Sequence, residues 1–259
     1  MPSLLLLLLS AALGGGDWSA LAWEAAPARV SLVEVVEEAE VFLGEEVRFV
    51  AQLCERVDRW EWLLTPFQPG THCGLALWPD EALLWRQEAY DAPVLAAFVP
   101  RDSRWAARAE RLRPHDRVLV TGRVRSCLAG RPWIEVTRIL RTREQMPEGT
   151  VLHAIRAGEM VRRGALDLAH AEVERALAAP LPTRPRAVLE AFRDGCQRLT
   201  ARLERGWRPT ERVLDQERRR LAEELQGRGR EALPASWSRR VRGLGGVAGP
   251  GSPTPEDGR

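Results

Sequence analysis

The sequence predicts an α+β protein in which a five-stranded β-domain is followed by a helical region and a tail. The first half contains stretches of alternating apolar and polar residues, with a helical pattern before the last two of them. From Pro147 onward the apolar residues recur at helical spacing. Beyond Gly227 the chain is rich in glycine, proline and serine and has no such period.

The composition is that of an ordinary globular protein. Of 259 residues, 45% are hydrophobic and 29% are charged, which excludes collagen-like and wholly disordered classes. No apolar run reaches the ~18 residues of a membrane-spanning helix, and a net charge of +2 gives no general attraction to nucleic acid or anionic membranes. All 38 basic residues are arginine, which indicates a GC-rich coding bias and weakens arginine as evidence of function.

The N-terminus has the pattern of an export signal. Leucines from Leu4 to Leu9 continue into an apolar core that ends at Leu13, too short to cross a bilayer. Ala20 and Ala22 then supply the small residues that a signal peptidase accepts. We expect cleavage after Ala22 and a periplasmic or secreted protein; a buried N-terminal helix is the alternative.

Each element of the β-domain has its own signal. A helix is expected over Ser31–Phe42, because Ser31 and Glu34 have the spacing of a capping box. Alternation predicts strands at 47–54, 60–65 and 92–99, with a shorter one at 74–78. A second helix is expected over 104–113. The long insert from Pro66 to Asp91 leaves the second and third strands open.

The clearest pattern is a hairpin near the end of this domain. Valines alternate with arginines over Asp116–Arg125, and Pro132–Leu140 returns with Ile134 and Val136 on one side. One dry and one wet face are therefore expected. The residues predicted to point inward are Val118, Val120, Val124, Ile134 and Val136. Gly122 fits a barrel corner, where the strand bends sharply.

Two segments resemble bacterial OB-fold domains. Phe42–Leu53, "FLGEEVRFVAQL", is similar to the entry into their first strand, and Leu112–Arg125 followed by Gly130–Ile139 is similar to their closing hairpin. The resemblance covers about Val30 to Arg143. It implies a five-stranded OB-like barrel, a fold that binds single strands through aromatic side chains and a basic groove. Another small β-barrel or α+β domain is the alternative.

The helical region is expected to contain four helices, over 151–163, 165–179, 184–205 and 210–226. Ala169, Val173, Ala176 and Pro180 have spacings similar to one helix of a tetratricopeptide repeat. A single hairpin is too little for such an array, so the region is interpreted as an appendage to the barrel. The expected units are residues 1–22 (signal peptide), 30–146 (barrel), 147–226 (helices) and 227–259 (disordered tail).

Candidate binding residues lie in the barrel. Trp60 and Trp62 share a face of the expected strand at 60–65, while Trp133 is expected to face outward with Arg123 and Arg125. Residues 104–143 hold eleven arginines and three acids, whereas 30–103 hold five arginines and fourteen acids. The basic half could therefore bind a polyanion. Alternatively, the two halves pair with each other and the tryptophans fill the barrel, which is the interpretation favoured for an exported protein.

Catalysis and metal binding find little support in the sequence. The chain lacks G-x-S-x-G, H-E-x-x-H and a glycine-rich phosphate loop, and its histidines and cysteines lack zinc-ligand spacing. His72 and Cys73 could form a thiol or metal site, but neighbours on a strand point to opposite faces. Export would permit disulfides among Cys54, Cys73, Cys127 and Cys196, with the pairing left open.

The expected function is therefore binding without catalysis, and with no cofactor or metal. The partner is a protein, glycan or polyanion outside the cytoplasm. Single-stranded nucleic acid bound through Trp60, Trp62, Arg123, Arg125 and Trp133 is the first alternative, and thiol- or metal-dependent activity at His72 and Cys73 is the second.

Overall fold

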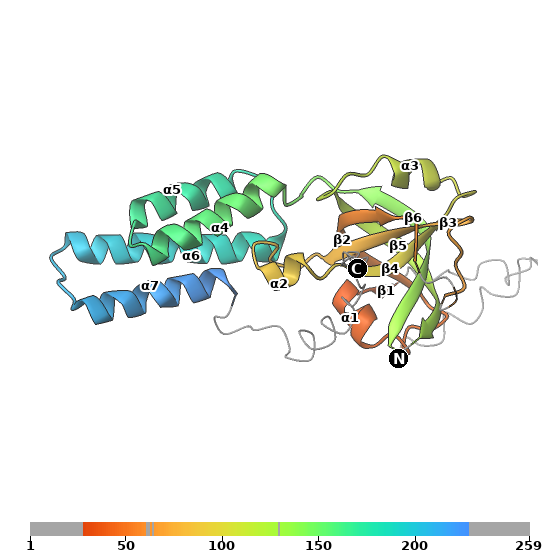
Figure 1. Cartoon of the computed structure of the whole chain (residues 1–259), viewed down its shortest axis with the longest axis horizontal. Helices are drawn as coiled ribbons and strands as arrows, with labels where there is room; N and C mark the ends of the chain where they lie inside the picture. Colours follow the sequence, from red (N-terminus) through yellow and green to blue (C-terminus); the bar gives the residue numbers. More distant parts are fainter. Residues whose placement is uncertain (1–27, 61–62, 64, 129, 228–259) are drawn as a thin grey trace, which may run out of the picture.

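A computed structural model describes residues 28–60, 63, 65–128 and 130–227. A β-barrel forms one end of the molecule and four helices form the other (Figure 1). The expected signal peptide and tail lie outside the described residues, so both stay predictions. Within the described part of the chain, no helix is long and apolar enough to cross a membrane.

Five strands close into the barrel. They are β2 (Glu46–Val57), β3 (His72–Pro79), β4 (Val94–Pro100), β5 (Arg117–Leu128) and β6 (Arg131–Arg141). The order around the barrel is β2-β3-β4-β6-β5, and β5 pairs back onto β2 to close it. Only β4 and β6 are parallel among these neighbours. A two-residue strand, β1 (Ala28–Arg29), pairs with β2. The fold class is the predicted one, an α+β protein with an OB-like barrel.

The closing hairpin of β5 and β6 has the predicted register. The five side chains expected inside are at most 2% exposed and line the barrel core, whereas Arg123 is exposed. Gly122 lies at a register shift between β5 and β6. A Cβ there would meet the Glu135 carbonyl oxygen and the Ile134 Cγ2 at 2.7 Å. The close approach of β6 thus explains the glycine, while the sharp bend of a barrel corner stays a prediction.

Short helices flank the strands. In α1 (Leu32–Glu37), the Ser31 Oγ accepts a 3.0 Å hydrogen bond from the Glu34 N–H, and the Glu34 carboxylate accepts one from the Ser31 N–H, which confirms the capping box. Its apolar face covers the barrel core. The helix ends at Glu37, so the predicted extension to Phe42 is wrong. Residues 38–44 form turns, because backbone bonds such as Gly44 N–H to the Val124 carbonyl fasten them to β5.

One predicted strand is wrong. Of residues 60–65, the described ones form no strand, and the second barrel strand is β3, where only a short strand was expected at 74–78. Trp60 leaves the ladder to pack its ring against Phe98 on the outside of the barrel. The remaining short helices are α2 (Gln87–Tyr90) and α3 (Ala106–Glu110), the latter shorter than the expected 104–113.

The four long helices form a bundle. They are α4 (Glu148–Arg162), α5 (Leu166–Leu177), α6 (Thr183–Glu204) and α7 (Glu211–Leu225), close to the predicted ranges. Consecutive helices pack together, and α7 packs back against α4. Glycines let α7 approach closely: a Cβ at Gly195 of α6 would lie 2.4 Å from Leu221, and one at Gly158 of α4 would lie 3.1 Å from Leu225.

Barrel and bundle share a hydrophobic core. Trp78 at the end of β3, with Leu83 and Trp85 in the segment between β3 and β4, packs with buried side chains of all four long helices. Figure 1 places α2, part of this segment, between the barrel and the bundle. The long insert at 66–91, which blurred the strand pattern, thus contains the residues that fix the bundle to the barrel.

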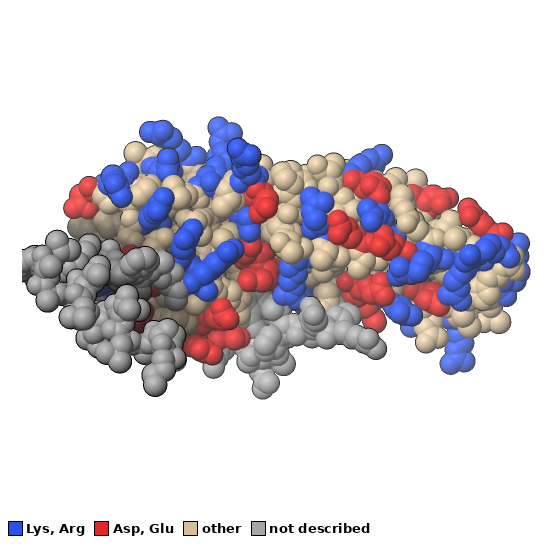
Figure 2. Space-filling view, turned by 180° about the vertical axis from the view of Figure 1, so that it is seen from behind, with Lys and Arg blue, Asp and Glu red and all other residues tan. Residues whose placement is uncertain are grey.

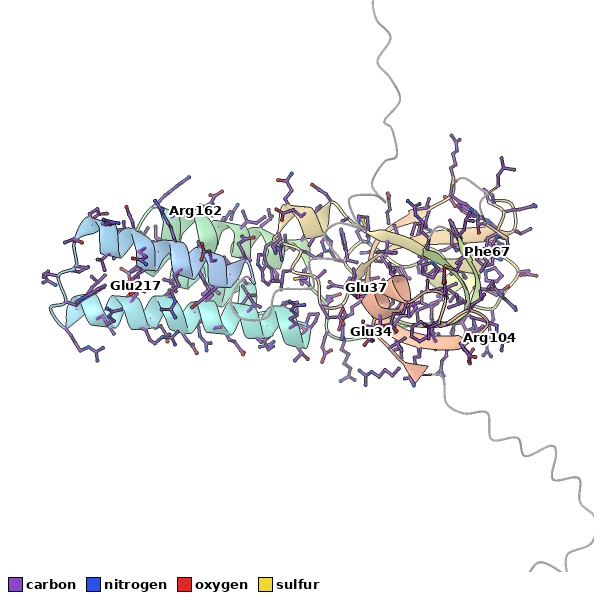
Figure 3. All side chains as sticks on the ribbon, turned by 90° about the horizontal axis from the view of Figure 1, so that it is seen from below. Glu34, Glu37, Phe67, Arg104, Arg162 and Glu217 are labelled. Atoms are coloured by element: carbon purple, nitrogen blue, oxygen red, sulfur yellow. The ribbon has the colours of Figure 1, made fainter. Side chains whose placement is uncertain are left out.

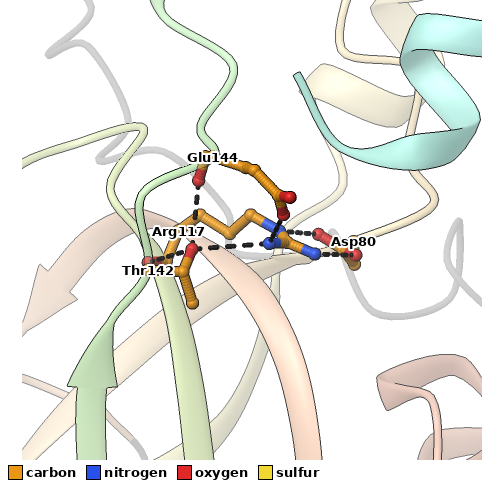
Figure 4. A network of polar contacts seen from close by, with 4 residues as sticks. All are labelled: Asp80, Arg117, Thr142 and Glu144. Atoms are coloured by element: carbon orange, nitrogen blue, oxygen red, sulfur yellow. Dashed lines mark hydrogen bonds and ion pairs between the residues drawn. The ribbon is translucent and has the colours of Figure 1, made fainter. Parts of the chain in front are cut away.

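A buried arginine lies at the same junction. Arg117, at the start of β5, is 9% exposed and donates to both carboxylate oxygens of Asp80, at 2.5 and 2.7 Å. Its guanidinium also contacts Glu144 and Thr142 (Figure 4). The side-chain hydrogen bond to Asp80 is the main cause that raises the pKa of Arg117. The network ties β5 to the segment after β3 and to the chain leading into α4.

Candidate ligand-binding site

An aromatic cluster covers part of the barrel's outer face. It consists of Trp60, Phe67, Phe98 and Trp133, of which all but Trp60 are nearly buried. The Phe98 ring is central, with centroids 5.1 Å from Trp60, 4.8 Å from Phe67 and 5.3 Å from Trp133. Phe98 comes from β4 and Trp133 from β6, whereas Trp60 and Phe67 come from the connection between β2 and β3. Figure 3 labels Phe67 in the half of the barrel far from the helices.

The β2–β3 connection is held over this face by an arginine. Arg101 donates from Nε to the Pro69 carbonyl oxygen at 3.1 Å and forms a 2.9 Å ion pair with Asp58. Inside the connection, the Trp60 indole N–H donates to the Phe67 carbonyl oxygen at 3.1 Å. The Asp58 side chain is 72% exposed, so this ion pair contributes little to stability. The polar contacts that hold the β2–β3 connection over this face are therefore ones that water can replace, whereas its Phe67 ring is 3% exposed and packs against Phe98.

Two polar atoms beneath the β2–β3 connection lack a hydrogen-bond partner. The Trp133 Nε1 and the His72 Nε2 are buried and make no hydrogen bond. The His72 ring lies 4.7 Å from that of Phe67, and its Nδ1 is 2.9 Å from the Thr71 Oγ1. Burial is the main cause that lowers the pKa of His72, against the opposing effect of Glu135 and Asp102. A buried N–H without an acceptor costs about 1–3 kcal/mol. The Trp133 indole N–H is therefore a hydrogen-bond donor that a ligand could satisfy.

The structure brings together only part of the predicted binding set. Trp60 and Trp133 are linked through Phe98, while Trp62 lies outside the described residues. Trp133 points away from the barrel core, as predicted, but is 6% exposed, since the cluster covers it. Arg125 is engaged by Glu135, whose Oε2 lies 2.6 Å from its Nε. Of the described members of the set, Trp60 and Trp133 do not fill the barrel, and they form no open stacking surface with Arg123 and Arg125.

Phe67 and Phe98 were missed as site residues. Phe98 lies beyond a register shift in the β3–β4 ladder: Val94 and Ala96 belong to the barrel core, but so do Ala97 and Val99, and Phe98 faces the other way. Alternation from Val94 and Ala96 would have placed Phe98 inside the barrel, so no periodic signal marked it as a site residue. Phe67 lies between two prolines of an irregular connection, so no periodic signal marked it.

Charge is distributed unevenly over the surface. Arginines predominate on the barrel half of the face in Figure 2, while the helical half carries both signs. Among the described residues, the ion pair of Arg117 with Asp80 joins the basic part of the barrel (residues 104–143) to its acidic part (residues 30–103). The ion pairs of Arg125 with Glu135 and of Arg141 with Asp116 both lie within the basic part. Pairing between the two halves is thus limited, and Arg123 makes no ion pair with any described residue.

The geometry separates His72 from Cys73. Cys73 belongs to the barrel core and its thiol donates to the Gly74 carbonyl oxygen at 3.6 Å, whereas His72 contacts Phe67 outside. They cannot work as a nucleophile and base from opposite faces. All four cysteines are unpaired. Burial raises the pKa of Cys54 to about 11 and that of Cys196 to about 12, which keeps both thiols protonated at neutral pH.

The described residues contain no group of three or more His, Cys, Asp or Glu side chains able to hold a metal ion. Two surface hollows lie on the bundle. One of about 300 Å³ is lined by Asp167, His170 and Gln197, among others. In it the His170 Nε2 and the Gln197 Nε2 are 2.8 Å apart. Both hollows are shallow, and neither involves the predicted site.

Comparison with known proteins gives no family. No family model matches the chain, and no curated protein matches it. Among solved structures, a putative aspartyl-tRNA synthetase from Leishmania major Friedlin matches with a TM-score of 0.33 and 9% sequence identity. The match covers 60% of this chain and 32% of that one, so the chain spans about a third of its length. A functional proposal therefore has to stand on the barrel's own geometry.

Proposed function

We propose that the protein is a non-catalytic binding protein of the periplasm or the extracellular space, and that its ligand site is the aromatic cluster on β4 and β6. The observation that carries the proposal is the Trp133 indole N–H, which is buried beside the Phe98 ring without an acceptor. A ring-bearing ligand with a hydrogen-bond acceptor would stack on Phe98 and accept from Trp133. The pattern of residues 4–22 supports export.

The charges around the site favour a neutral ligand. Glu135 and Asp102 are the charged groups that act on His72, and Glu135 also occupies Arg125. With Arg125 held by Glu135 and Arg101 held by Asp58, neither arginine is free to neutralise a chain of phosphates. Sugar rings carry hydroxyl acceptors and an apolar face that stacks on aromatic side chains. A glycan chain is thus the partner that this surface fits best.

Entry of such a ligand needs movement of the β2–β3 connection, because Trp133 is only 6% exposed. The contacts of Arg101 with Asp58 and Pro69 hold that connection. Replacing Arg101 by alanine should make the site easier to open and should raise the apparent affinity, since less of the protein is closed.

Calorimetric titration with a short chitin oligosaccharide tests the proposal. We expect binding by the wild type, loss of affinity in Trp133→Phe, which keeps a ring but removes the donor, and no change in the control Trp207→Phe on the bundle. Affinity that is equal in Trp133→Phe and the wild type would place the ligand elsewhere.

Cell fractionation tests the compartment: recovery only from the cytoplasm, with residues 1–22 attached, contradicts export.

Single-stranded nucleic acid is the second candidate, favoured by one observation: Arg123 is exposed beside β6 and makes no ion pair with a described residue. A mixed-sequence oligonucleotide should then bind with an affinity that falls steeply as salt rises. Binding of the oligonucleotide that Arg123→Glu abolishes, without binding of the oligosaccharide, would decide for this candidate.

A further inference from the structure

Three arginines form a row across the outer face of the barrel. Arg29 of β1 is in register with Arg48 of β2, Arg48 with Thr121 of β5, and Thr121 with Arg138 of β6. Residues in direct register share a face, and Val47 and Phe49 point into the core, so Arg48 and its row partners point outward. We refer to Arg29, Arg48 and Arg138 as the arginine row.

The arginine row is not neutralised within the described chain. All three side chains are exposed, and none forms an ion pair with a described residue. Arg29 and Arg48 lie on neighbouring strands, about 4.8 Å apart, where like charges repel. The next outward positions along the same strands are Val50, Leu119 and Leu140, which are in register and half-buried. An apolar strip therefore borders the row.

A segment of opposite character lies just before β2. Residues 38–45, the acidic turn, carry Glu38, Glu40 and Glu45, which are exposed and form no ion pair with described residues. Between them Val41 is 70% exposed and Leu43 is 52% exposed, unusually high values for such side chains. The turn thus presents carboxylates and apolar groups together.

The acidic turn has a fixed place on the barrel. The Gly44 N–H donates to the Val124 carbonyl oxygen at 2.8 Å, and the Val124 N–H donates to the Glu45 carbonyl oxygen at 3.0 Å. Glu40 is close enough to Cys127 to contribute to the raised pKa of that thiol. The turn therefore lies along the later part of β5, next to the strands that bear the arginine row.

We propose that the protein self-associates through these two features, the acidic turn of each copy lying on the arginine row of the other. The carboxylates of one copy would neutralise the arginines of its partner, and Val41 and Leu43 would cover the apolar strip. Because turn and row are neighbours on one barrel, a two-fold axis lets both contacts form at once. The arginine row and the acidic turn share no residue with the aromatic cluster.

Complementarity favours a second copy over a polyanion. A chain of phosphates on the arginine row would meet the unneutralised carboxylates of the neighbouring turn and would leave Val41 and Leu43 exposed. The partner that fits must carry carboxylates, arginines and an apolar strip. A second copy of this chain carries all three of these features.

Reversal of each patch in turn tests the proposal by sedimentation velocity on the full chain. The wild type should dimerise at low salt and dissociate as salt rises. Arg48→Glu with Arg138→Glu, and separately Glu38→Arg with Glu40→Arg, should each weaken dimerisation by roughly tenfold or more, because like charges then meet. The control reverses Arg205 and Arg212 on the bundle, which are exposed and unpaired among described residues, and should dimerise normally.

Mixing the two patch variants provides the decisive step. Each alone brings like charges together, but in an equimolar mixture the intact turn of one meets the intact row of the other, and the reversed turn meets the reversed row. The mixture should therefore regain the wild-type dimer. A wild type that is monomeric at low salt, a dimer that survives both reversals, or a mixture that stays monomeric overturns the proposal. Oligonucleotide binding that requires Arg48 and Arg138 in a monomeric wild type would assign the row to a polyanion instead.

Discussion

The indole nitrogen of Trp85 donates a 2.7 Å hydrogen bond to the backbone carbonyl oxygen of Leu225, a residue 140 positions away. Trp85 lies in the connection between β3 and β4, and Leu225 ends α7. Both side chains are buried in the core that barrel and bundle share. The bond fastens the last long helix to the segment between β3 and β4.

Trp85→Phe should therefore loosen the bundle from the barrel. The variant keeps a ring but leaves the Leu225 carbonyl unpaired and a small cavity, at a cost of about 2 kcal/mol. Denaturant unfolding measures this loss as a lower midpoint, while Trp207→Phe, on the more accessible α6–α7 turn, should change the midpoint less. An unchanged midpoint for Trp85→Phe would mean that the junction contributes little to stability.

The barrel register predicts opposite outcomes for two neighbouring substitutions on β5. Val120→Asp places an unpaired carboxylate in the core and should cost about 3 kcal/mol or more. Arg123→Glu, on the exposed side, should change the free energy of unfolding by less than about 0.5 kcal/mol. Thermal unfolding of the two variants checks the register. Equal destabilisation, or the reverse order, would contradict it.

Close packing of α7 makes Gly195 intolerant of a side chain. A Cβ there would meet Leu221 at 2.4 Å, so Gly195→Ala should displace α7 and cost about 1–3 kcal/mol. In the Gly195→Ala variant, the backbone amides of α7 should exchange their hydrogens faster than those of α4. Gly149→Ala is the matched control, because a Cβ at Gly149 has nothing within 4 Å, and it should be neutral or slightly stabilising. Similar effects from both substitutions would argue against close approach of α7.

Acid should destabilise the junction through His115. This residue has a positive φ of 69°, its ring lies 5.2 Å from that of Trp78, and its Nδ1 is buried without a partner. Burial is the main cause that lowers its pKa from 6.5, outweighing the carboxylate of Glu148. The unfolded chain therefore takes up the proton first as pH falls. The stability that neutral His115 contributes is complete above pH 6.5 and is lost as pH falls below 6.5 and through the lowered pKa of the folded protein.

The test compares the pH dependence of unfolding in the wild type and in His115→Asn. Asparagine tolerates positive φ and does not titrate, so the variant should lose less stability between about pH 7 and pH 5. His72, whose pKa is also lowered by burial, contributes in the same direction in both proteins. Parallel stability curves would show that His115 is not a source of the pH dependence.

Sequence periodicity predicted the elements that have one buried face and one exposed face. The β5–β6 hairpin, with Val120 inside and Arg123 outside, could be derived because each side chain alternates between core and solvent. The capping box at Ser31 and Glu34 marked the start of α1 for a similarly local reason. The helix end at Glu37 could not be derived in this way, since the hydrogen bonds that fasten residues 38–44 come from β5, far along the chain.

The candidate site was less accessible to sequence reasoning. Trp60 has the alternation of a strand residue, but its ring packs on Phe98, a contact that depends on how the barrel closes. Outward direction was predicted for Trp133, yet its burial depends on a connection between two other strands. Likewise, the docking function of Trp78 and Trp85 became visible only with the bundle in place.

The most direct test of the ligand site is the indole N–H resonance of Trp133 in an NMR titration with a short chitin oligosaccharide. The resonance is assigned as the one missing from Trp133→Phe. In the free protein we expect a Trp133 signal at the shift of an unbonded indole, and we expect it to move downfield as the N–H gains an acceptor. A Trp133 resonance that stays in place while the oligosaccharide binds, or an oligosaccharide that fails to bind while the oligonucleotide shifts the resonance, would contradict it.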